Sequence, residues 1–283
     1  VQTFDNSNGQ LTVNQEADIK AASLLNPNGQ IDTGRLKAEA TRLDNRSGKI
    51  RSDELTELKA SDGLNNPSGL IGSAQDIRIH DGNRQTLTLN NTSGEILAGQ
   101  NLDIQAKTLA KQGELAANQN LSLKLKDSFT VEQDIRAGQG LHISSEGDIN
   151  NSYTLEGGRF AVLEADNIRN TAAGIIQSGS NTQLKADNIT NRGLINSNGL
   201  TLLEAGDTVL NIGSGRVYGD WVAIEADKLA NQEETANSET KAATIAAREH
   251  LAVGAKEITN QEGAKLSSEG SLSLGGSLDE QHQ

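Results

Sequence analysis

Carboxylates are the side chains of this sequence that come closest to a catalytic pattern. Glu164 and Asp166 stand two residues apart at the end of an alternating apolar run, and Glu225 and Asp227 repeat the arrangement in a second run. Paired Asp and Glu side chains supply the acid and base of glycoside hydrolysis, so a polysaccharide-active enzyme is one candidate. The recurrence of "LEAD" and "IEAD" at equivalent places favours a solvated outer strand face instead. We therefore predict that the chain is not an enzyme.

The four histidines are the other candidate metal ligands. They lie far apart, at His80, His142, His250 and His282, and none has a partner at the spacing of a metal site. The Gly-Gly-x-Gly-x-Asp repeat that binds calcium in some solenoids is absent, and "DGNRQ" (81–85) lacks the carboxylates of an EF-hand loop. The sequence predicts no metal and no other cofactor.

The composition argues against an ordinary globular core. Hydrophobic residues make up 34% of the 283 residues but aromatic residues only 2%, so Leu, Ile, Val and Ala must fill a narrow interior. There is no Cys, which excludes disulfides. A net charge of −13 argues against nucleic acid as a partner, and no apolar run is long enough for stable membrane insertion.

An eight-residue element recurs along the chain. "FDNSNGQL" (4–11), "LDNRSGKI" (43–50) and "LNNTSGEI" (89–96) share one pattern of apolar residue, Asn and Gly. Aligned on the polar residue that closes the apolar–x–Asn step, most repeats are about 18 to 21 residues long, a spacing typical of solenoids. Gln112 and Gln133 fill this position in two repeats. In the others it is held by Asn6, Asn26, Asn45, Asn66, Asn91, Asn151, Asn170, Asn191, Asn211, Asn231 and Asn260.

Alternating runs between these elements indicate strands. "LDIQA" (102–106) and "LSLKL" (121–125) have the period of two that half-buried strands show. Short strands separated by Gly and Asn turns predict an all-β fold, a right-handed parallel β-helix of about 13 coils of roughly 20 residues. We expect residues 1–283 to form one repeat domain. Because "VQTFDNSNG" begins in the middle of the pattern, we also expect a fragment of a longer protein.

The Asn-x-x-Gly element is predicted to be the corner of each coil. Asn and Gly both tolerate left-handed backbone geometry, and stacked Asn side chains could form a ladder of amide hydrogen bonds. Pro27 and Pro67 directly follow a corner Asn, where a turn favours a fixed φ. The recurrence is therefore interpreted as structural.

Units such as "LDNRSGKIRSDELTELKA" and "LNNTSGEILAGQNLDIQAKTL" resemble the haemagglutinin repeats of filamentous haemagglutinin-type exoproteins. These are the secreted partners of bacterial two-partner secretion, and they include adhesins and the CdiA-type toxins of contact-dependent growth inhibition. The resemblance implies a β-helical shaft that is exported by an outer-membrane transporter and displayed on the surface of a Gram-negative cell. Such repeats serve adhesins and toxin carriers alike, so both parents stay open.

Two insertions interrupt the period and are candidate binding loops. Residues 80–87 lengthen one unit, and residues 232–243 lengthen another at its corner. Insertions in solenoids map to loops on one face, often the binding face, although a longer surface loop also costs little free energy. The candidate binding side chains are Glu233, Glu234, Glu239 and Lys241.

The few aromatic residues are the remaining exceptions. Trp221 aligns with Phe160 and Leu200, and we predict that it packs in the interior. Tyr153 and Tyr218 lie near loops and could stack on a sugar.

The function favoured by the sequence is a structural stalk that presents an adhesive or toxin-bearing tip to other cells. The alternative is a module that itself binds a receptor or glycan on a target cell, and the enzyme is the weakest candidate.

Overall fold

The computed structural model describes residues 1–236, 238–279 and 282, and these form strands and turns without any helix. The fold is a parallel β-solenoid of about 14 turns, which confirms the predicted all-β coil architecture. The right hand of the coils remains a prediction, and it agrees with the right-handed crossovers that parallel strands almost always adopt. The chain divides into two compact units, Val1–His142 and Ile143–Gln283, described separately below.

Each coil of unit 1 contributes three strand segments, which stack on the same segments of the next coil. Strand β3 (Gln30–Asp44) contains all three and pairs in parallel with β4 (Lys49–Asn65). The partners Ile31↔Ile50, Ala38↔Leu58 and Leu43↔Leu64 lie one in each segment. Three parallel sheets therefore surround one interior.

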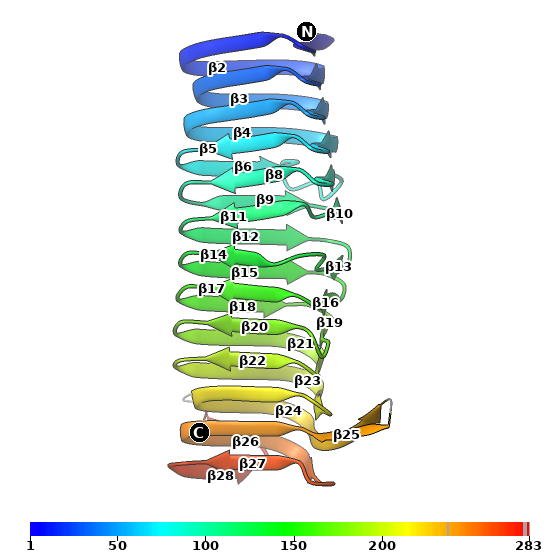
Figure 1. Ribbon diagram of the computed structural model, residues 1–283, viewed down its shortest axis with the longest axis vertical. Coiled ribbons are helices and arrows are strands. Elements are labelled where there is room, and N and C mark those ends of the chain that lie inside the picture. Colours follow the sequence, from blue (N-terminus) through cyan, green and yellow to red (C-terminus); the bar gives the residue numbers. More distant parts are fainter. Residues whose placement is uncertain (237, 280–281, 283) are drawn as a thin grey trace. The chain divides into compact units, whose positions relative to one another are not determined.

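The remaining strands of unit 1 follow the same course (Figure 1). They are β1 (Thr3–Asp5), β2 (Gln10–Leu25), β5 (Leu70–Ser73), β6 (Asp76–His80), β7 (Thr88–Asn90), β8 (Glu95–Ala98), β9 (Leu102–Ala106), β10 (Thr108–Lys111), β11 (Glu114–Ala117), β12 (Asn120–Leu125), β13 (Phe129–Thr130) and β14 (Ile135–Ala137). Strand β15 (Gly140–Ser145) contains the boundary between the units.

Unit 2 repeats the three-segment coil. Its strands are β16 (Ile149–Asn151), β17 (Thr154–Gly157), β18 (Phe160–Glu164), β19 (Asn167–Asn170), β20 (Ile175–Ser178), β21 (Asn181–Asn191), β22 (Leu194–Ser197), β23 (Leu200–Ile212), β24 (Arg216–Ala236), β25 (Glu239–Ala242), β26 (Thr244–Asn260), β27 (Lys265–Ser268) and β28 (Ser271–Gly275). Neighbouring coils pair through parallel strands, whereas β24 and β25 pair antiparallel.

Aliphatic columns fill the interior of each unit. In β12 the side chains of Leu121, Leu123 and Leu125 point inward and are about 1% exposed, whereas the residues between them face out. This alternation places every second residue in the core, as the pleat of a strand requires. Because coils stack like on like, Ile31 and Ile50 lie in one buried column and a large aromatic ring is not needed to fill it.

Candidate functional site

The corner asparagines of unit 1 form a chain of hydrogen bonds from coil to coil. Asn26 Nδ2 donates to Asn45 Oδ1 at 2.7 Å, and Asn45 Nδ2 donates in turn to Asn66 Oδ1 at 2.7 Å. The same bond links Asn6 to Asn26 and Asn66 to Asn91. The side chains from Asn26 to Asn91 are fully buried, and each Nδ2 also faces a backbone carbonyl of its own corner.

Unit 2 contains a ladder of the same kind. Asn170 Nδ2 donates to Asn191 Oδ1 at 2.9 Å, and the bonds between the other neighbours are 2.7 to 2.9 Å long. The members, in order, are Asn151, Asn170, Asn191, Asn211, Asn231 and Asn260. Each interior member of the ladder accepts a hydrogen bond from one neighbour and donates one to the other. Few buried polar atoms are therefore left unsatisfied, and a polar column can lie inside the fold.

The prediction that Asn and Gly tolerate left-handed geometry at the corner is met by only some of the corner glycines. In five corners of unit 1 the residue with positive φ is the one before the Gly, for example Asn28 at 53° and Ser47 at 52°, whereas Gly113, Gly213 and Gly263 have a positive φ themselves. In the five corners of the first kind the Gly is required for space. A methyl group on Gly48 would lie 2.2 Å from the Asn26 carbonyl oxygen and 2.5 Å from Asn45 Oδ1. The ladder therefore occupies the volume that any side chain at this Gly would need.

Glutamine replaces asparagine at two shortened corners, and the corner at Gln112 is two residues shorter than that at Asn91. Gly113 follows Gln112 directly, and φ at Gly113 is +55°. The extra methylene lets Gln112, which is 1% exposed, donate to the Gln133 carbonyl oxygen at 3.0 Å and accept from the Glu132 N–H at 2.9 Å. Gln133 Nε2 donates back to the carbonyl oxygen of Gly113. The amide chain thus continues by a different route.

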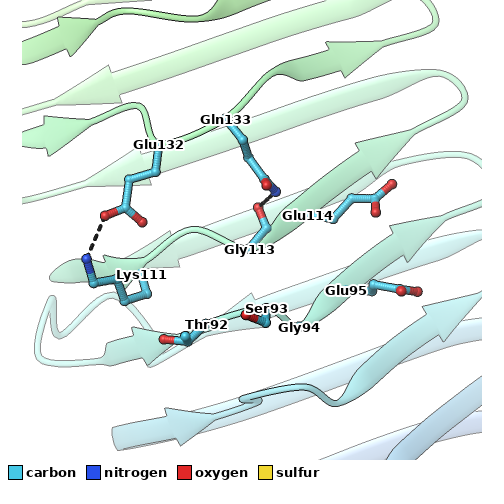
Figure 2. A pocket seen from close by; sticks show the side chains of 9 residues that line it. All are labelled: Thr92, Ser93, Gly94, Glu95, Lys111, Gly113, Glu114, Glu132 and Gln133. Carbon is cyan, nitrogen blue, oxygen red and sulfur yellow. Dashed lines mark hydrogen bonds and ion pairs between the residues drawn. The ribbon is translucent and has the colours of Figure 1, made fainter.

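The short corners leave a hollow of about 380 Å³ on the outside of unit 1, shown in Figure 2. Lys111 Nζ lies 2.8 Å from Glu132 Oε1, and this hydrogen bond holds the pKa of Glu132 below its usual value. Glu95 of β8 and Glu114 of β11 are partners in the parallel pairing of these two strands. The hollow is an open, polar surface whose lysine is already paired, so it offers no convergent set of groups for chemistry.

Residues 80–87 form a loop closed around one carboxylate. Asp81 is fully buried and accepts hydrogen bonds from the N–H groups of Arg84, Thr86 and Leu87. Burial raises the pKa of Asp81, but these backbone bonds together outweigh it and the pKa lies below its ordinary value. The insertion is therefore a compact structural turn. This role could not be predicted from the sequence, in which a buried Asp cannot be distinguished from a surface Asp.

Residues 232–243 form a hairpin between the end of β24 and β25; Asn237 lies outside the described residues. Glu234 makes a two-pronged contact with Arg192, with distances of 2.8 Å from Nε to Oε2 and from Nη2 to Oε1. This hydrogen bonding lowers the pKa of Glu234. Lys241 Nζ lies 3.2 Å from Glu239 Oε2 on the exposed strand β25. Of the four candidate binding residues, Glu234 is thus engaged by the solenoid itself.

The prediction that Trp221 packs in the interior is wrong. Its side chain is 38% exposed and its indole N–H donates to Glu249 at 2.8 Å. The strand alternation explains the error, because Val222 and Ile224 point inward and Trp221 must therefore point out. The ring lies 5.4 Å from that of His250. Phe160 and Tyr153 are each 43% exposed.

The acidic pairs stand on outer faces. Asp227 forms an ion pair with Lys256 of the next coil at 2.7 Å. His80 lies 3.2 Å from Glu57, again one coil away. Within the described part of the chain, no group of three or more His, Asp or Glu side chains could hold a metal ion. The same residues include no helix that could cross a membrane.

A second polar corner escaped the sequence reasoning. Buried Thr side chains bond the Ser four residues earlier: Thr56 to Ser52 at 2.8 Å, and Ser197 to Thr201 at 2.9 Å. Thr201 also donates to the carbonyl oxygen of Tyr218 in the next coil. The spacing Ser-x-x-x-Thr recurs in the sequence and could have been found by searching for it.

Comparison with known families agrees with this repeat architecture. The family model for the haemagglutinin repeat matches residues 1–66, 33–113, 97–152, 157–239 and 222–279. Stacked coils with a common corner define the class of repeat-built β-solenoids. The chain belongs to the haemagglutinin-repeat family, the filamentous haemagglutinin-type and CdiA exoproteins of two-partner secretion.

Curated relatives match over parts of the chain. Toxin CdiA of Yersinia pestis is 36% identical over 124 residues, which are 40% of this chain and 4% of the relative. Deoxyribonuclease CdiA of Dickeya dadantii (strain 3937) is 27% identical over 258 residues, 72% of this chain and 8% of the relative. tRNA nuclease CdiA of Yersinia mollaretii is 28% identical over 210 residues, 72% of this chain and 7% of the relative.

The chain therefore covers less than a tenth of the length of each of these relatives. No solved structure gives a significant match. The family consists of secreted or cell-surface exoproteins of Gram-negative bacteria, and the chain is a structural repeat segment of that kind.

Proposed function

We propose that this segment is a passive shaft that carries an adhesive or toxin-bearing tip toward other cells. The observation that supports it best is the buried amide ladder, which binds each corner to the next in both units. A ladder of this kind repeats one contact and concentrates no chemistry at any coil. Stability is then spread over neighbouring coils, as in other solenoids.

The proposal includes the absence of enzymatic activity in these residues. The nuclease names of two relatives describe those whole proteins, of which the chain matches only a small part. Support comes from the outer carboxylates, since Asp227 and Glu57 each face a basic or imidazole side chain of an adjoining coil rather than a shared cleft. Turnover of a polymeric sugar by the isolated chain would contradict this part of the proposal.

An outer-membrane transporter of the two-partner type is the proposed export partner, acting on the parent protein. Nucleic acid and a membrane interior are not proposed as partners, because the net charge is −13 and the outer faces are polar and charged. The resulting location is the bacterial surface or the medium.

A replacement experiment tests the shaft. Residues 1–283 of the parent would be exchanged for an unrelated β-solenoid with the same number of coils, and contact with target cells would be measured. A passive shaft predicts that contact and any toxicity survive the exchange. Loss of contact with export and surface display unchanged would reject the proposal. The matched control deletes the same coils without replacement and should shorten the reach of the protein.

A second candidate is direct binding of a glycan, and exposed Trp221 is the observation that favours it. An outward indole beside His250 and Glu249 offers an apolar ring rimmed by polar groups, which is suited to a sugar ring. A glycan array probed with the chain and with Trp221→Ala separates the two functions. Signals lost with Trp221 would support binding, whereas a blank array supports the shaft.

A further inference from the structure

Strand β25 has one edge without a partner strand among the described residues. Its four residues pair with β24 through Glu233↔Ala242, Glu234↔Lys241, Thr235↔Thr240 and Ala236↔Glu239. All four are exposed, and Figure 1 draws this hairpin projecting from the coils of unit 2. An open strand edge is a template for another strand, and proteins usually cover or blunt such edges.

The base of the hairpin is held in a fixed direction. On one face, Glu234 bonds Arg192, and a methyl group on Gly213 would lie 2.9 Å from Glu234 Oε2. On the other face, a methyl group on Gly263 would lie 3.6 Å from Ala242 Cβ. One face therefore looks toward earlier corners of unit 2 and the other toward a later corner. The plane of the hairpin lies across the direction in which these coils stack.

A hydroxyl contact inside the hairpin shows which backbone N–H and C=O groups of β25 point away from β24. Thr235 Oγ1 and Thr240 Oγ1 are 2.7 Å apart, the close approach typical of a pair that exchanges no backbone hydrogen bonds. The N–H and C=O of Thr240 therefore point away from β24. Those of Glu239 and Lys241 point toward it, because the direction alternates along an antiparallel strand.

We propose that this edge pairs with the same edge of a second copy of the chain, antiparallel and centred on Thr240. Each Thr240 N–H then donates to the Thr240 carbonyl of the other copy. Glu239 of each copy lies opposite Lys241 of the other, which gives two symmetric ion pairs. The competing symmetric register, centred on Lys241, sets Lys241 directly against Lys241 and leaves Glu239 opposite Ala243, and like charges directly opposite destabilise a sheet.

Charge continues to alternate beyond the new contact. On the same face, Glu234 stands opposite Lys241 within each hairpin. The row across the four strands therefore reads Glu234, Lys241, Glu239 of the second copy and Ala236 of the second copy, so no like charges adjoin. This self-complementarity is what identifies a second copy, rather than an unrelated strand, as the occupant.

The pairing also fixes how two shafts would lie. The two-fold axis is perpendicular to the hairpin plane and hence along the stacking direction of unit 2, so the two copies of unit 2 run parallel. Overlap of four-residue strands leaves a gap of about 13 Å between the coils. This gap exceeds the Debye length of about 8 Å at physiological ionic strength, so the like net charges are largely screened. Parallel pairing suits proteins displayed on one surface, although the contact itself does not depend on the proposed function.

Mixing two charge variants tests the proposal. The full 283-residue chain would be studied by sedimentation equilibrium up to millimolar concentration, because so small an interface gives weak association. Lys241→Glu and Glu239→Lys should each weaken self-association at least tenfold, since each turns two attractive contacts into repulsive ones. Mixed in equal amounts, the two variants should associate again, because Glu at 239 and 241 of one meets Lys at 239 and 241 of the other.

Two further variants separate edge pairing from folding effects. Thr240→Pro removes the outward N–H and should abolish association without changing the circular-dichroism spectrum, because Pro is tolerated at a free strand edge. Lys49→Glu makes the same charge change on an exposed position of unit 1 and should leave association unchanged. A wild-type chain that stays monomeric, or single variants that fail to associate when mixed, would overturn the proposal.

Discussion

Asn26 Nδ2 and Asn45 Oδ1 are 2.7 Å apart, and both side chains are completely shielded from solvent. The two residues are 19 positions apart in sequence but occupy the same corner of successive coils. A buried amide is tolerated only when its donors and its acceptor are satisfied, and the next coil supplies what each corner lacks. The repeat length and the fold are thereby linked through one hydrogen bond.

Removing one amide from this chain should destabilise unit 1. In Asn45→Ala, Asn26 loses its acceptor and Asn66 loses its donor, both in a buried site. We expect a loss of about 3 kcal/mol in the free energy of unfolding. Urea unfolding followed by circular dichroism measures it. Asn65→Ala is the matched control, since Asn65 is exposed and directly precedes the corner residue of the next coil, Asn66, and it should change stability by less than about 0.5 kcal/mol.

Gly48, which directly precedes β4, and Gly63, which lies within β4, should respond in opposite ways to alanine. Gly48→Ala places a methyl group 2.2 Å from the Asn26 carbonyl oxygen and should cost about 2–3 kcal/mol. A methyl group on Gly63 meets no atom within 4 Å, so Gly63→Ala should be neutral or stabilising by about 0.5 kcal/mol. Equal effects of the two changes in thermal unfolding would argue against the corner geometry described here.

The loop around Asp81 should open in acid. The folded-state pKa of Asp81 lies below its value in the unfolded chain, because the bonds from the N–H groups of residues 84–87 favour the ionised form more than burial disfavours it. The unfolded state therefore binds the proton more readily, and the stabilisation present at neutral pH is lost as the pH falls below about 3.8. Hydrogen exchange at residues 84–87 measures the opening.

Asp81→Asn should open the same loop at neutral pH and remove the acid dependence, since an amide supplies one acceptor oxygen in place of two. Asp103→Asn, on an exposed position of β9, is the matched control and should leave exchange in the loop unchanged. Protection at residues 84–87 that persists in Asp81→Asn would contradict the assigned role.

Replacing Ile224 by alanine should lower the free energy of unfolding more than replacing the larger Trp221 does. Ile224→Ala leaves a cavity in a fully buried column and should cost about 3 kcal/mol. Trp221→Ala removes a ring that is 38% exposed and should cost about 1 kcal/mol, because solvent fills the vacated space. Unfolding is followed by circular dichroism, as Trp221 is the one tryptophan of the sequence. A larger loss of stability for Trp221→Ala than for Ile224→Ala would contradict the outward position of the ring.

The coil architecture could be predicted from the sequence because each repeat places the same residue types at the same positions. A corner Asn, an alternating run and a Gly recur at one spacing, and only stacking buries them all. The third sheet was less visible, because its segments, such as residues 63–65, are three residues long and merge with the corner. Features that occur once, such as the contact between Arg192 and Glu234, have no period and left no signal.

The errors have local causes. Trp221 shares the first position of its apolar run with Phe160 and Leu200, and this position is one residue out of phase with the inward residues Val222 and Ile224. The tolerance of Gly for left-handed backbone explains its presence at a corner from the sequence alone, whereas Gly48 serves a close approach of backbone and amide. Sequence pattern shows that a residue is needed but not which of two physical reasons applies.

Spin-label distances within unit 1 test the stacked coils most directly. The sequence has no Cys, so labels on Thr12→Cys and Arg136→Cys are unambiguous. The two positions are joined by six register steps through Asp32, Arg51, Gly72, Leu97 and Ala116. At about 4.8 Å a step, double electron–electron resonance should give a narrow distribution near 29 Å, and about 19 Å from Arg51→Cys to Arg136→Cys. A broad distribution, or two distances that do not differ by about 10 Å, would contradict coil-on-coil stacking.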